Sequence, residues 1–401
     1  MTGIRGIVAK ALVALAATTL ISGAASAKDD EIVIGLAIAE SGFMAAYDGD
    51  GTNSVKLWVD DQNAKGGILG KKLRYIVADT KTDRAQGSRA GQQLIDEGVD
   101  LLVVSCDYDQ GAPAAGAAQR AGVASVFLCA MDPKAGVQGA GAYAFTSTIA
   151  AQVQGSAGAG WANSKLGAKT YYSLLDTTTE FDKSVCAGFE WGAEKVGMTS
   201  LGTDTFKNDD LTIQSQITRI LALPTKPDVL ALCSWVPGGA SAVLQLRSAG
   251  LTMPIIATSS FDGTYWIDAV PNLDGLYVPV QASVHGNDPR PDVNAFVDRF
   301  KAKFGNPPAT MYGVPIYPFM DLWARAVEKV GSTDAAQVVP AMEQYKDEPT
   351  IIGPMTFTSE WHIQTDAEIV MMEFKDRKPI PVGTYRFGQQ IPTEVLFRMK
   401  Q

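Results

Sequence analysis

Aromatic and acidic side chains follow the apolar runs of this sequence, at the points where buried strands would end. The run LLVV at 101–104 is followed by Asp107 and Tyr108, and the run VLALC at 229–233 is followed by Trp235. In open parallel sheets, ligands bind beyond the carboxyl ends of the strands. Aromatic rings there can cover the apolar face of a small molecule, while a tyrosine hydroxyl or an indole N–H binds its polar end. The pattern therefore predicts a ligand site at the strand ends.

The two segments share one arrangement of residues. CDYDQGAPAAGAAQRAGV begins at Cys106, and CSWVPGGASAVLQLRSAGL begins at Cys233. Each has a cysteine at the end of a strand, an aromatic residue, a helix of small residues, and then Arg and Gly. A structural repeat would place Tyr108 and Trp235 on opposite sides of one ligand, and a chance resemblance is the alternative.

Other residues near the strand ends have two interpretations. Tyr47 and Phe181 also follow apolar strands, but core packing is an equal alternative for any one of these rings taken alone. Asp107 and Asp109 precede a helix, where an Asp can accept backbone N–H groups as an N-cap. The sequence favours this role for Asp109 and leaves the role of Asp107 open.

Catalytic chemistry has little support in the sequence. There are two histidines, His285 and His362, and no G-x-S-x-G, H-E-x-x-H or G-x-x-x-x-G-K-[ST] motif. The cysteines show no C-x-x-C spacing that would indicate zinc or thioredoxin-like chemistry. We therefore expect no catalytic residues, no bound metal and no cofactor.

The first residues have the pattern of a secretory signal peptide. Arg5 and Lys10 precede a short apolar run at 11–21 and a small-residue cleavage site at 25–27. The run is shorter than a segment that spans a bilayer. We expect cleavage near Ala27 and a mature chain in the periplasm, with a retained membrane anchor as the alternative.

The charge of the chain argues against two classes of partner. The net charge is −9, and removal of Arg5 and Lys10 makes the mature chain more negative. An acidic chain is unsuited to nucleic acid and to anionic membrane surfaces. Hydrophobic residues make up 46% of the sequence, enough for a large core. A mature length of roughly 370 residues is long for a single core and typical of a protein with two lobes.

Apolar runs alternate with helical patterns, and near-continuous apolar strands indicate parallel sheets covered on both faces. The expected strands form two successive sets. The first set is 32–39, 73–78, 101–106, 124–129 and 143–146, and the second set is 170–175, 200–206, 229–233, 255–258 and 276–280.

Helix boundaries are marked by capping residues. Asp83 is placed to cap a helix that ends at Gly98, and Gly122 and Gly250 are placed to end two others. Beyond residue 280 the apolar spacing predicts helices around 293–300, 317–330 and 334–345. The tail segments IGPMTF and AEIVMMEF are typical of antiparallel edge strands.

The fold class that follows is α/β, with two lobes whose parallel sheets are flanked by helices. Residues 1–27 would be the signal peptide. Residues 28–148 plus 282–353 would form the first lobe, and residues 149–281 plus 354–401 the second. The chain that returns after both sheets are built is expected to cross between the lobes and to supply part of a hinge.

The four cysteines would lie in a compartment that permits disulfides, and three full pairings exist. The strands that end at Cys106 and Cys129 are expected to be neighbours, so a bridge between them is feasible. Cys186 lies one turn into the helix over the strand next to that of Cys233, which makes the second bridge a looser case. Buried free thiols are the alternative.

The segment SGFMAAYDGDGTNSVKLWVDDQNAKGGILGKKL, residues 41–73, resembles the opening of the leucine/isoleucine/valine-binding type of periplasmic substrate-binding protein. The similarity continues through DTKTDRAQG, RSAGL and IGPMTF, and so covers nearly the whole mature chain. It implies the type I periplasmic binding protein fold, in which two Rossmann-like lobes are joined by a three-stranded hinge. Such proteins close on a solute and deliver it to the permease of an ATP-driven (ABC) importer.

The resemblance also implies ligand positions. Tyr108 and Met131 stand where amino-acid binders have hydroxyl side chains for the ligand carboxylate, and Ser259 stands where they have the glutamate that pairs with the ammonium group. A buried ammonium without a carboxylate partner is costly, so the branched-chain amino acids are disfavoured. The candidate ligand-binding residues are Ser41, Tyr47, Asp107, Tyr108, Cys129, Met131, Phe181, Trp235 and Ser259.

The expected function is therefore that of a periplasmic receptor. It would deliver a small organic solute with an aromatic or apolar face to the membrane permease of an ABC importer, by hinge closure, and it would act as a monomer without nucleic acid. A quaternary ammonium ion facing the aromatic rings and Asp107 is a variant of this interpretation. The alternatives are a branched-chain amino acid or amide binding protein of the same family and a ligand-sensing subunit for a membrane receptor. An exported hydrolase is disfavoured by the missing motifs.

Overall fold

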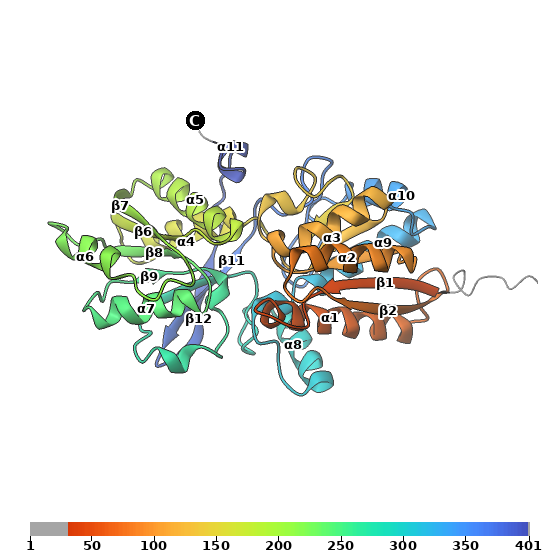
Figure 1. The fold of residues 1–401 in the computed structure, drawn as a ribbon, viewed down its shortest axis with the longest axis horizontal. Helices are drawn as coiled ribbons and strands as arrows, with labels where there is room; N and C mark the ends of the chain where they lie inside the picture. The colour runs from red at the N-terminus through yellow and green to blue at the C-terminus, as the bar shows by residue number, and fades with distance from the viewer. Residues whose placement is uncertain (1–30, 400–401) are drawn as a thin grey trace, which may run out of the picture.

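Two β-sheets lie side by side along the long axis of the molecule, each flanked by helices (Figure 1). The computed structural model describes residues 31–399. The expected signal peptide at 1–27 lies outside the described residues. The sequence pattern of two successive strand sets is confirmed, because each set forms its own sheet.

The first sheet is entirely parallel, in the order β2-β1-β3-β4-β5. Its strands β3 and β4 are buried along their whole length, as expected where helices cover both faces. The edge strand β2 carries exposed residues. The bounds are β1 (Glu31–Ile38), β2 (Lys72–Asp79), β3 (Leu101–Val104), β4 (Ala124–Phe127) and β5 (Ala144–Thr146).

The second sheet has the order β12-β11-β10-β9-β8-β6-β7. It is parallel from β7 to β10, and β11 and β12 are antiparallel additions at one side. The bounds are β6 (Thr170–Asp176), β7 (Thr199–Phe206), β8 (Val229–Cys233), β9 (Ile255–Ile256), β10 (Leu276–Val280), β11 (Ile369–Lys375) and β12 (Lys378–Tyr385).

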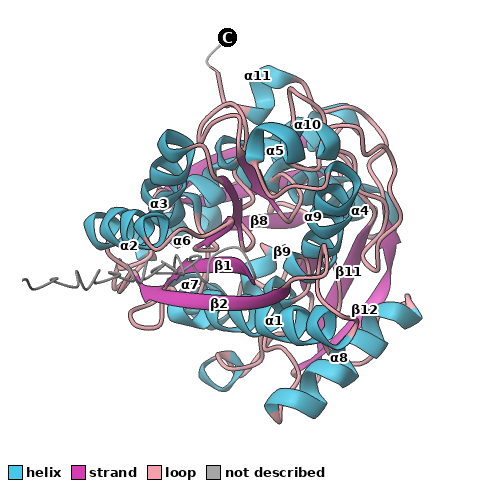
Figure 2. Cartoon of the chain, turned by 90° about the vertical axis from the view of Figure 1, so that its right-hand side faces the viewer, coloured by secondary structure: helices cyan, strands magenta, loops and turns pink. Residues whose placement is uncertain are grey.

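Helices from distant parts of the chain cover each sheet. The first sheet is flanked by α1 (Ala45–Ala64), α2 (Arg84–Asp96), α3 (Tyr108–Ala121), α8 (Pro291–Phe304), α9 (Ile316–Val330) and α10 (Ala335–Met342). The second is flanked by α4 (Ala151–Lys165), α5 (Glu180–Lys195), α6 (Gln214–Ala222) and α7 (Gly238–Ser248), and the short α11 (Thr393–Leu396) contacts α5. Figure 2 shows α1 and α2 on opposite sides of β1 and β2. We call these two assemblies the first and the second lobe.

The predicted helix boundaries are confirmed at three positions. Asp83 accepts the backbone N–H of Gln86 at the start of α2. Gly122 and Gly250 follow α3 and α7 with φ angles of 71° and 82°, in the left-handed region that glycine adopts without strain. The positions at which these helices begin or end are therefore determined by single capping residues in the local sequence.

The predicted cap of α3 was assigned to the wrong aspartate. Asp107 is the N-cap, because its Oδ1 accepts the backbone N–H of Gln110 at 3.2 Å. Asp109 lies in the first turn of the helix, and its Oδ2 accepts the backbone N–H of Glu180 at 3.3 Å. The helix begins at Tyr108, so Asp109 is free to contact the other lobe.

The tail departs from the expectation of two edge strands. IGPMTF does not form a strand, and its only pairing is an isolated bridge between Glu348 and Met355. Gly353 adopts a φ of 107° and Pro354 has no N–H to donate, which explains the irregular backbone. AEIVMMEF does contain β11, but β11 lies between β10 and β12. The edge strand is β12, which the sequence pattern missed.

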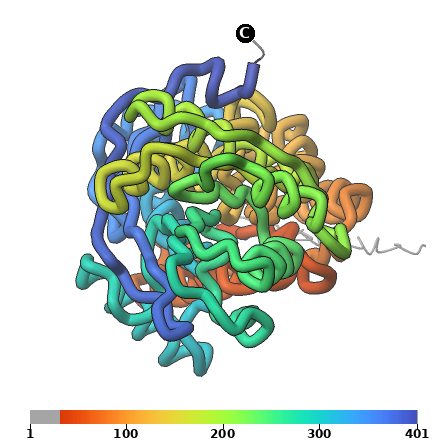
Figure 3. The backbone as a smooth tube through the Cα atoms, turned by 90° about the vertical axis from the view of Figure 1, so that its left-hand side faces the viewer, coloured from red at the N-terminus to blue at the C-terminus, as the bar shows by residue number. Residues whose placement is uncertain are grey.

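The chain crosses between the lobes after β5, after β10 and before β11. Two of these crossings are hydrogen-bonded to each other, since the N–H of Ala150 donates to the carbonyl of Gln364 at 2.8 Å. Figure 3 shows the C-terminal segment, in blue, running along the edge of the second lobe. The residue boundaries of the two lobes stay a prediction.

Both disulfide bridges that the sequence makes feasible are present, and the alternative of buried free thiols is wrong. Cys106 bonds to Cys129 with the two Cα atoms 4.4 Å apart, and Cys186 bonds to Cys233 with a separation of 5.6 Å. The first bridge ties the segments that follow β3 and β4, which are adjacent strands. Between residues 31 and 399, the structure contains no helix that combines the length and the apolar character needed to span a membrane.

Candidate functional site

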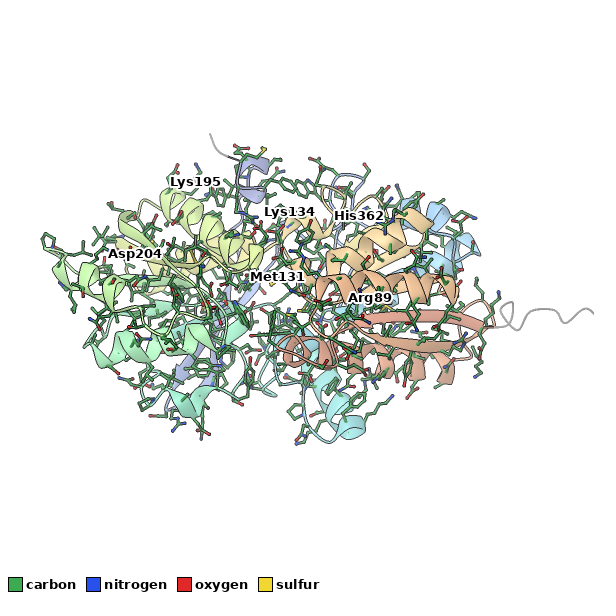
Figure 4. All side chains as sticks on the ribbon, viewed as in Figure 1. Arg89, Met131, Lys134, Lys195, Asp204 and His362 are labelled. Atoms are coloured by element: carbon green, nitrogen blue, oxygen red, sulfur yellow. A yellow bond between two sulfur atoms is a disulfide. The ribbon has the colours of Figure 1, made fainter. Side chains whose placement is uncertain are left out.

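A cavity of about 280 Å³ lies between the two lobes, at the carboxyl ends of strands from both sheets. Its walls come from the segments that follow β1, β3 and β4 in the first lobe and β6 and β8 in the second. Figure 4 places Met131, one of the lining residues, near the boundary between the two halves of the molecule. This is the position that the strand-end pattern predicts for a ligand site.

Most of the candidate residues line this one cavity. The lining includes Tyr47, Asp107, Tyr108, Cys129, Met131, Phe181 and Trp235. Ser41 and Ser259 are not part of the lining. The ligand-binding roles of all nine residues stay predictions, but the fold brings seven of them to a common space.

Ser41 and Ser259 are engaged elsewhere. The exposed Ser41 donates a hydrogen bond to Asp79 at 3.0 Å and thus holds the loop after β1. Ser259 is fully buried behind the cavity wall, where its hydroxyl lies 2.7 Å from that of Tyr312. The N–H of Ser259 donates to the side chain of Gln154 at 2.8 Å. A carboxylate is therefore absent from the position that the resemblance singled out.

The first-lobe wall is held rigidly by its supporting elements. Gly111 in the first turn of α3 approaches β3 so closely that a Cβ there would come within 2.8 Å of the carbonyl of Ser105. The bridge between Cys106 and Cys129 joins the loop before this helix to the loop after β4. Tyr108, the first residue of α3, stacks on Phe127 with ring centroids 6.2 Å apart. The ring of Tyr108 is thus positioned by packing on its far face.

Aromatic rings from both lobes meet on one side of the cavity. Trp235 packs against Phe43 with centroids 5.2 Å apart and meets Tyr47 edge-on at 6.4 Å. Tyr47 in turn meets Tyr312 edge-on at 5.9 Å. The hydroxyl of Tyr47 donates to the carbonyl of Val236 at 3.2 Å, which is a direct bond from the first lobe to the second. We call Phe43, Tyr47, Trp235 and Tyr312 the aromatic group.

Three lining residues of the cavity, Asp132, Glu180 and Lys183, belong to a network of ion pairs. Glu180 of the second lobe accepts Lys134 of the first lobe at 2.7 Å and Lys183 of its own helix at 2.8 Å. Arg398 near the C-terminus bonds both to Glu180 and to Asp132, the latter at 2.8 Å. Burial alone would raise the pKa of Glu180, but these three cations outweigh it and lower the pKa to about 2. The network joins both lobes and the C-terminal segment.

Two further carboxylates, Asp107 and Asp182, form no ion pair with any residue that the structure describes, although the charge of Lys183 lowers the pKa of Asp182 in part. Burial, with the charge of Asp109 as the next cause, raises the pKa of Asp107 to about 7. Asp182 is fully buried in the first turn of α5, and burial, followed by the charge of Asp176, raises its pKa well above the ordinary value. The charge of Asp107 contributes to the same shift, so these two groups from opposite lobes interact.

Sequence reasoning missed several lining residues. Phe43 precedes α1 inside the segment that carries the family resemblance, so its position gave a usable signal. Tyr312 comes from a short turn between α8 and α9, where no strand end marks it. The charged residues Arg84, Asp132, Glu180 and Lys183 also line the cavity. The ion pairs that join Asp132 to Arg398 and Glu180 to Lys134 connect residues far apart in the sequence, so spacing alone could not identify them.

The arrangement is suited to enclosing a molecule. Neither histidine lines the cavity, and His285 and His362 are bonded to Asp262 and Glu343 outside it. Among the residues that the structure describes, no group of three or more His, Cys, Asp or Glu side chains could hold a metal ion. The lining combines aromatic rings, hydroxyls and carboxylates from two lobes that a hinge connects.

Comparison with known proteins identifies one family. A family model described as periplasmic binding protein matches residues 31–378. The Leu/Ile/Val-binding protein BraC3 of Rhizobium johnstonii is 26% identical over 337 residues, covering 82% of this chain and 87% of that protein. A protein of Pseudomonas aeruginosa named amino acid binding protein is 24% identical, covering 92% of this chain and 96% of its own.

Solved structures share the fold. The substrate-binding protein LivJ of Streptococcus pneumoniae, in complex with isoleucine, has a TM-score of 0.77 at 22% identity and covers 89% of this chain and 99% of its own. A solute-binding protein from Rhodopseudomonas palustris, in complex with 3,4-dihydroxybenzoic acid, has a TM-score of 0.74 at 19% identity, with 90% and 99% coverage. The two-lobed α/β architecture with parallel sheets is therefore that of these binding proteins.

Proposed function

Because this chain belongs to the periplasmic binding protein family, we propose that it is a periplasmic solute receptor that closes on a small organic molecule and delivers it to the permease of an ABC importer. The observation that carries the proposal is a single cavity lined from both lobes at their strand ends. A ligand that touches both lobes only when they are together shifts the hinge equilibrium toward the closed arrangement.

The solute we propose has an aromatic or apolar face. The aromatic group, with Tyr108 and Phe181, supplies flat apolar surfaces to the cavity from both lobes. Pockets of this kind select by ring contact and by a few polar groups at defined points. That aromatic acids bind to a protein of this fold, as in the complex with 3,4-dihydroxybenzoic acid, is compatible with such a pocket.

Leucine, isoleucine and valine are the competing solutes, because two of the relatives are named Leu/Ile/Val-binding proteins. Against them, Ser259 offers no carboxylate and faces Tyr312 instead of the cavity. Met131 offers a thioether where a hydroxyl would be needed for the ligand carboxylate. An unpaired buried ammonium is strongly unfavourable.

A screen of thermal stability with the purified mature protein tests the proposal. A ligand that binds only the folded state raises the melting temperature by mass action. We expect aromatic solutes to raise it and leucine, isoleucine and valine to have little effect, with calorimetry giving the affinities. Micromolar or tighter leucine binding would overturn the solute class and keep the receptor function. Hydrolysis of a chromogenic ester panel, with no binding of any solute, would overturn both.

The remaining parts of the proposal concern location and assembly. We propose that the mature chain begins after Ala27, works in the periplasm as a monomer, and has no catalytic activity. The mass of the exported protein and its elution on a calibrated size-exclusion column test the first two points. An uncleaved N-terminus would mean that the chain is anchored instead.

A further inference from the structure

Beyond β12 the chain returns to the boundary between the two lobes. Residues 391–399 follow the last strand of the second sheet and include the short helix α11. Figure 1 shows α11 beside the place where the two halves of the molecule meet. Ile391 and Leu396 are buried, so this segment belongs to the packed structure. We call residues 391–399 the strap.

The strap is fixed to the second lobe by packing and by a buried hydrogen bond. α11 contacts α5, one of the helices that flank the second sheet. The side-chain amide of Gln152, at the start of α4, donates to the carbonyl of Leu396 at 2.7 Å. These contacts lie within the second lobe, so they can persist when the lobes separate.

The strap also contacts the first lobe. Phe397 stacks on Trp361, with the ring centroids 5.6 Å apart and the ring planes at 17°. Trp361 directly precedes His362, whose ring stacks on Phe145 of β5 in the first sheet. A segment that is anchored on one lobe thus has a ring contact on the other.

Arg398 makes a polar contact across the boundary. Its Nη1 donates to Oδ2 of Asp132 at 2.8 Å, and Asp132 lies in the first lobe, in the loop after β4. Its Nη2 pairs with Glu180 in the first turn of α5, in the second lobe. Ser184, one turn further along α5, donates to the same oxygen of Asp132 at 2.7 Å. Asp132 is 1% exposed and Ser184 is fully buried, so both are shielded from bulk water.

The burial of Asp132 makes this junction depend on the arrangement of the lobes. A buried carboxylate is costly unless a cation and hydrogen bonds compensate it. Two of its partners, Arg398 and Ser184, come from the strap and from the second lobe. Separation of the lobes would replace both partners with water, which hydrates the carboxylate. Loss of Arg398 therefore raises the free energy of the closed arrangement more than that of an open one.

We propose that the strap is a clamp on the closed arrangement, in which Arg398 holds Asp132 of the first lobe to Glu180 of the second and releases Asp132 before the lobes separate. The clamp sets the hinge equilibrium of the unliganded protein. Among the described residues, Arg398 is not part of the cavity lining, so it is a positioning residue that acts through the lobes. The inference rests on the proposed hinge closure and does not depend on the identity of the solute.

Small-angle scattering of the mature protein without solute tests the clamp. We expect Arg398→Gln to have a larger radius of gyration than the unmodified protein, because the closed arrangement loses population. Asp132→Asn keeps an acceptor for the N–H of Lys134 and should increase the radius in the same direction. The double variant should expand no more than Arg398→Gln alone, because both changes remove the same contact.

Arg219→Gln is the matched control. It removes the same charge and breaks a pair with Asp204 of 2.8 Å, but α6 and β7, which carry the two residues, both belong to the second lobe. Its radius of gyration should equal that of the unmodified protein.

Hydrogen–deuterium exchange distinguishes opening of the lobes from a general loss of stability. In Arg398→Gln, exchange should become faster in the loop after β4 and in the first turn of α5. It should stay unchanged in the buried strands β3 and β8. Faster exchange in these strands as well would show that Arg398 stabilises the fold as a whole, and it would overturn the clamp.

The remaining outcomes separate this inference from the proposed function. An unchanged radius in Arg398→Gln, or an equal expansion in Arg219→Gln, would overturn the clamp. Neither result bears on the receptor function, which the thermal screen tests separately. Expansion of Arg398→Gln without expansion of the control, in a protein that binds no solute of the screen, would support the clamp and contradict the receptor function.

Discussion

Trp235 is the residue whose structural and ligand-binding roles are most easily separated. Its ring lies between the lobes against Phe43 and Tyr47, and its buried indole N–H has no hydrogen-bond partner among residues 31–399. A solute that stacks on this ring and accepts its N–H would gain about 0.5–1.5 kcal/mol from ring geometry and about 1.5–3 kcal/mol from burial. The ring contacts of Trp235 with Phe43 and Tyr47 are made across the boundary between the lobes.

We therefore predict that Trp235→Ala and Tyr108→Ala each weaken solute binding by about tenfold to a hundredfold, since ~1.4 kcal/mol corresponds to a factor of ten. The melting temperature of the unliganded protein should change little. Trp323, fully buried against Trp58, is the control, because emptying such a core site costs about 3–5 kcal/mol. A large loss of stability with unchanged affinity in Tyr108→Ala would show that its ring serves the core.

His362 packs against β5, just before the chain first crosses between the lobes. It is fully buried, it stacks on Phe145 with centroids 3.8 Å apart, and its Nδ1 lies 3.0 Å from the carbonyl of Ala144. Burial lowers its pKa, although bonds to Ala144 and Glu343 act in the opposite direction. The folded protein thus binds this proton less tightly than the unfolded chain does, so the neutral ring stabilises the fold most above about pH 6.5.

His362→Phe should keep the stacking and leave the carbonyl of Ala144 without its donor. We expect the free energy of unfolding to fall by about 1–3 kcal/mol at neutral pH. The difference from the unmodified protein should shrink as the pH falls below about 6.5, because the unfolded histidine then takes up a proton. Urea unfolding measured across this pH range gives the difference directly. A constant difference at every pH would contradict the argument.

At the scale of single residues, the sequence identified side chains at strand ends and missed side chains from elsewhere. Tyr108 and Trp235 could be found because an apolar strand precedes each of them. Tyr312 reaches the cavity from a short turn far along the chain, where no strand end marks it. Contacts between distant parts of the chain determine whether such a side chain reaches the cavity, and local sequence periodicity carries no information about those contacts.

At the scale of elements, the two disulfides fix the strand ends that carry the site. Cys106 and Cys129 enclose a sequence separation of 23 residues, and Cys186 and Cys233 one of 47. Loop closure of this length constrains the unfolded chain by roughly 3–4 kcal/mol per bridge. The first bridge lies in the cavity wall itself, so its loss should affect binding as well as stability.

We predict that reduction of both bridges lowers the midpoint of urea unfolding, by an amount that corresponds to about 2–4 kcal/mol for each bridge. Cys106→Ser with Cys129→Ser should weaken solute binding, whereas Cys186→Ser with Cys233→Ser should affect mainly stability. Mass spectrometry after alkylation without reductant should detect no free thiol. Four alkylated cysteines in the exported protein would exclude both bridges.

The elements themselves show where pattern reasoning works. Buried strands such as β3 and β8 are unbroken apolar runs, and helix ends are marked by Asp83 and Gly122, so these were predictable. β12, KPIPVGTY, has mostly polar or partly exposed residues and two prolines, so its sequence resembles a loop. It is a strand because β11 offers it a free edge to pair with.

At the scale of the whole molecule, the structure has its lobes in contact across the cavity. The ties are the bond from Tyr47 to Val236, the bond from the N–H of Glu180 to Asp109, and the ion pair of Glu180 with Lys134. The sequence could indicate two lobes and a hinge, but it could not indicate these ties. They depend on the relative position of two separately folded units, which only the complete chain defines.

Glu180 takes part in two of these ties, through its backbone N–H to Asp109 and through its carboxylate to Lys134. Partly exposed pairs contribute about 0.2–1 kcal/mol each. We predict that Glu180→Gln, which removes the pair with Lys134 between the lobes, reduces the preference for the closed arrangement by about 0.2–1 kcal/mol, or up to roughly fivefold. Small-angle scattering should then give a larger radius of gyration for the unliganded protein, and solute affinity should fall by a similar factor.

Glu194 provides a matched control for the prediction on Glu180, and the titration of Glu180 gives it a pH dependence. Glu194 lies on the same helix and pairs with its neighbour Lys195 at 3.3 Å, so Glu194→Gln should leave the radius of gyration and the affinity unchanged. Since the pKa of Glu180 is lowered to about 2, its contribution should be complete above about pH 4.3 and should be lost as the pH falls toward 2. If Glu180→Gln scatters and binds as the unmodified protein does, the ion pair between Glu180 and Lys134 does not help to hold the lobes together.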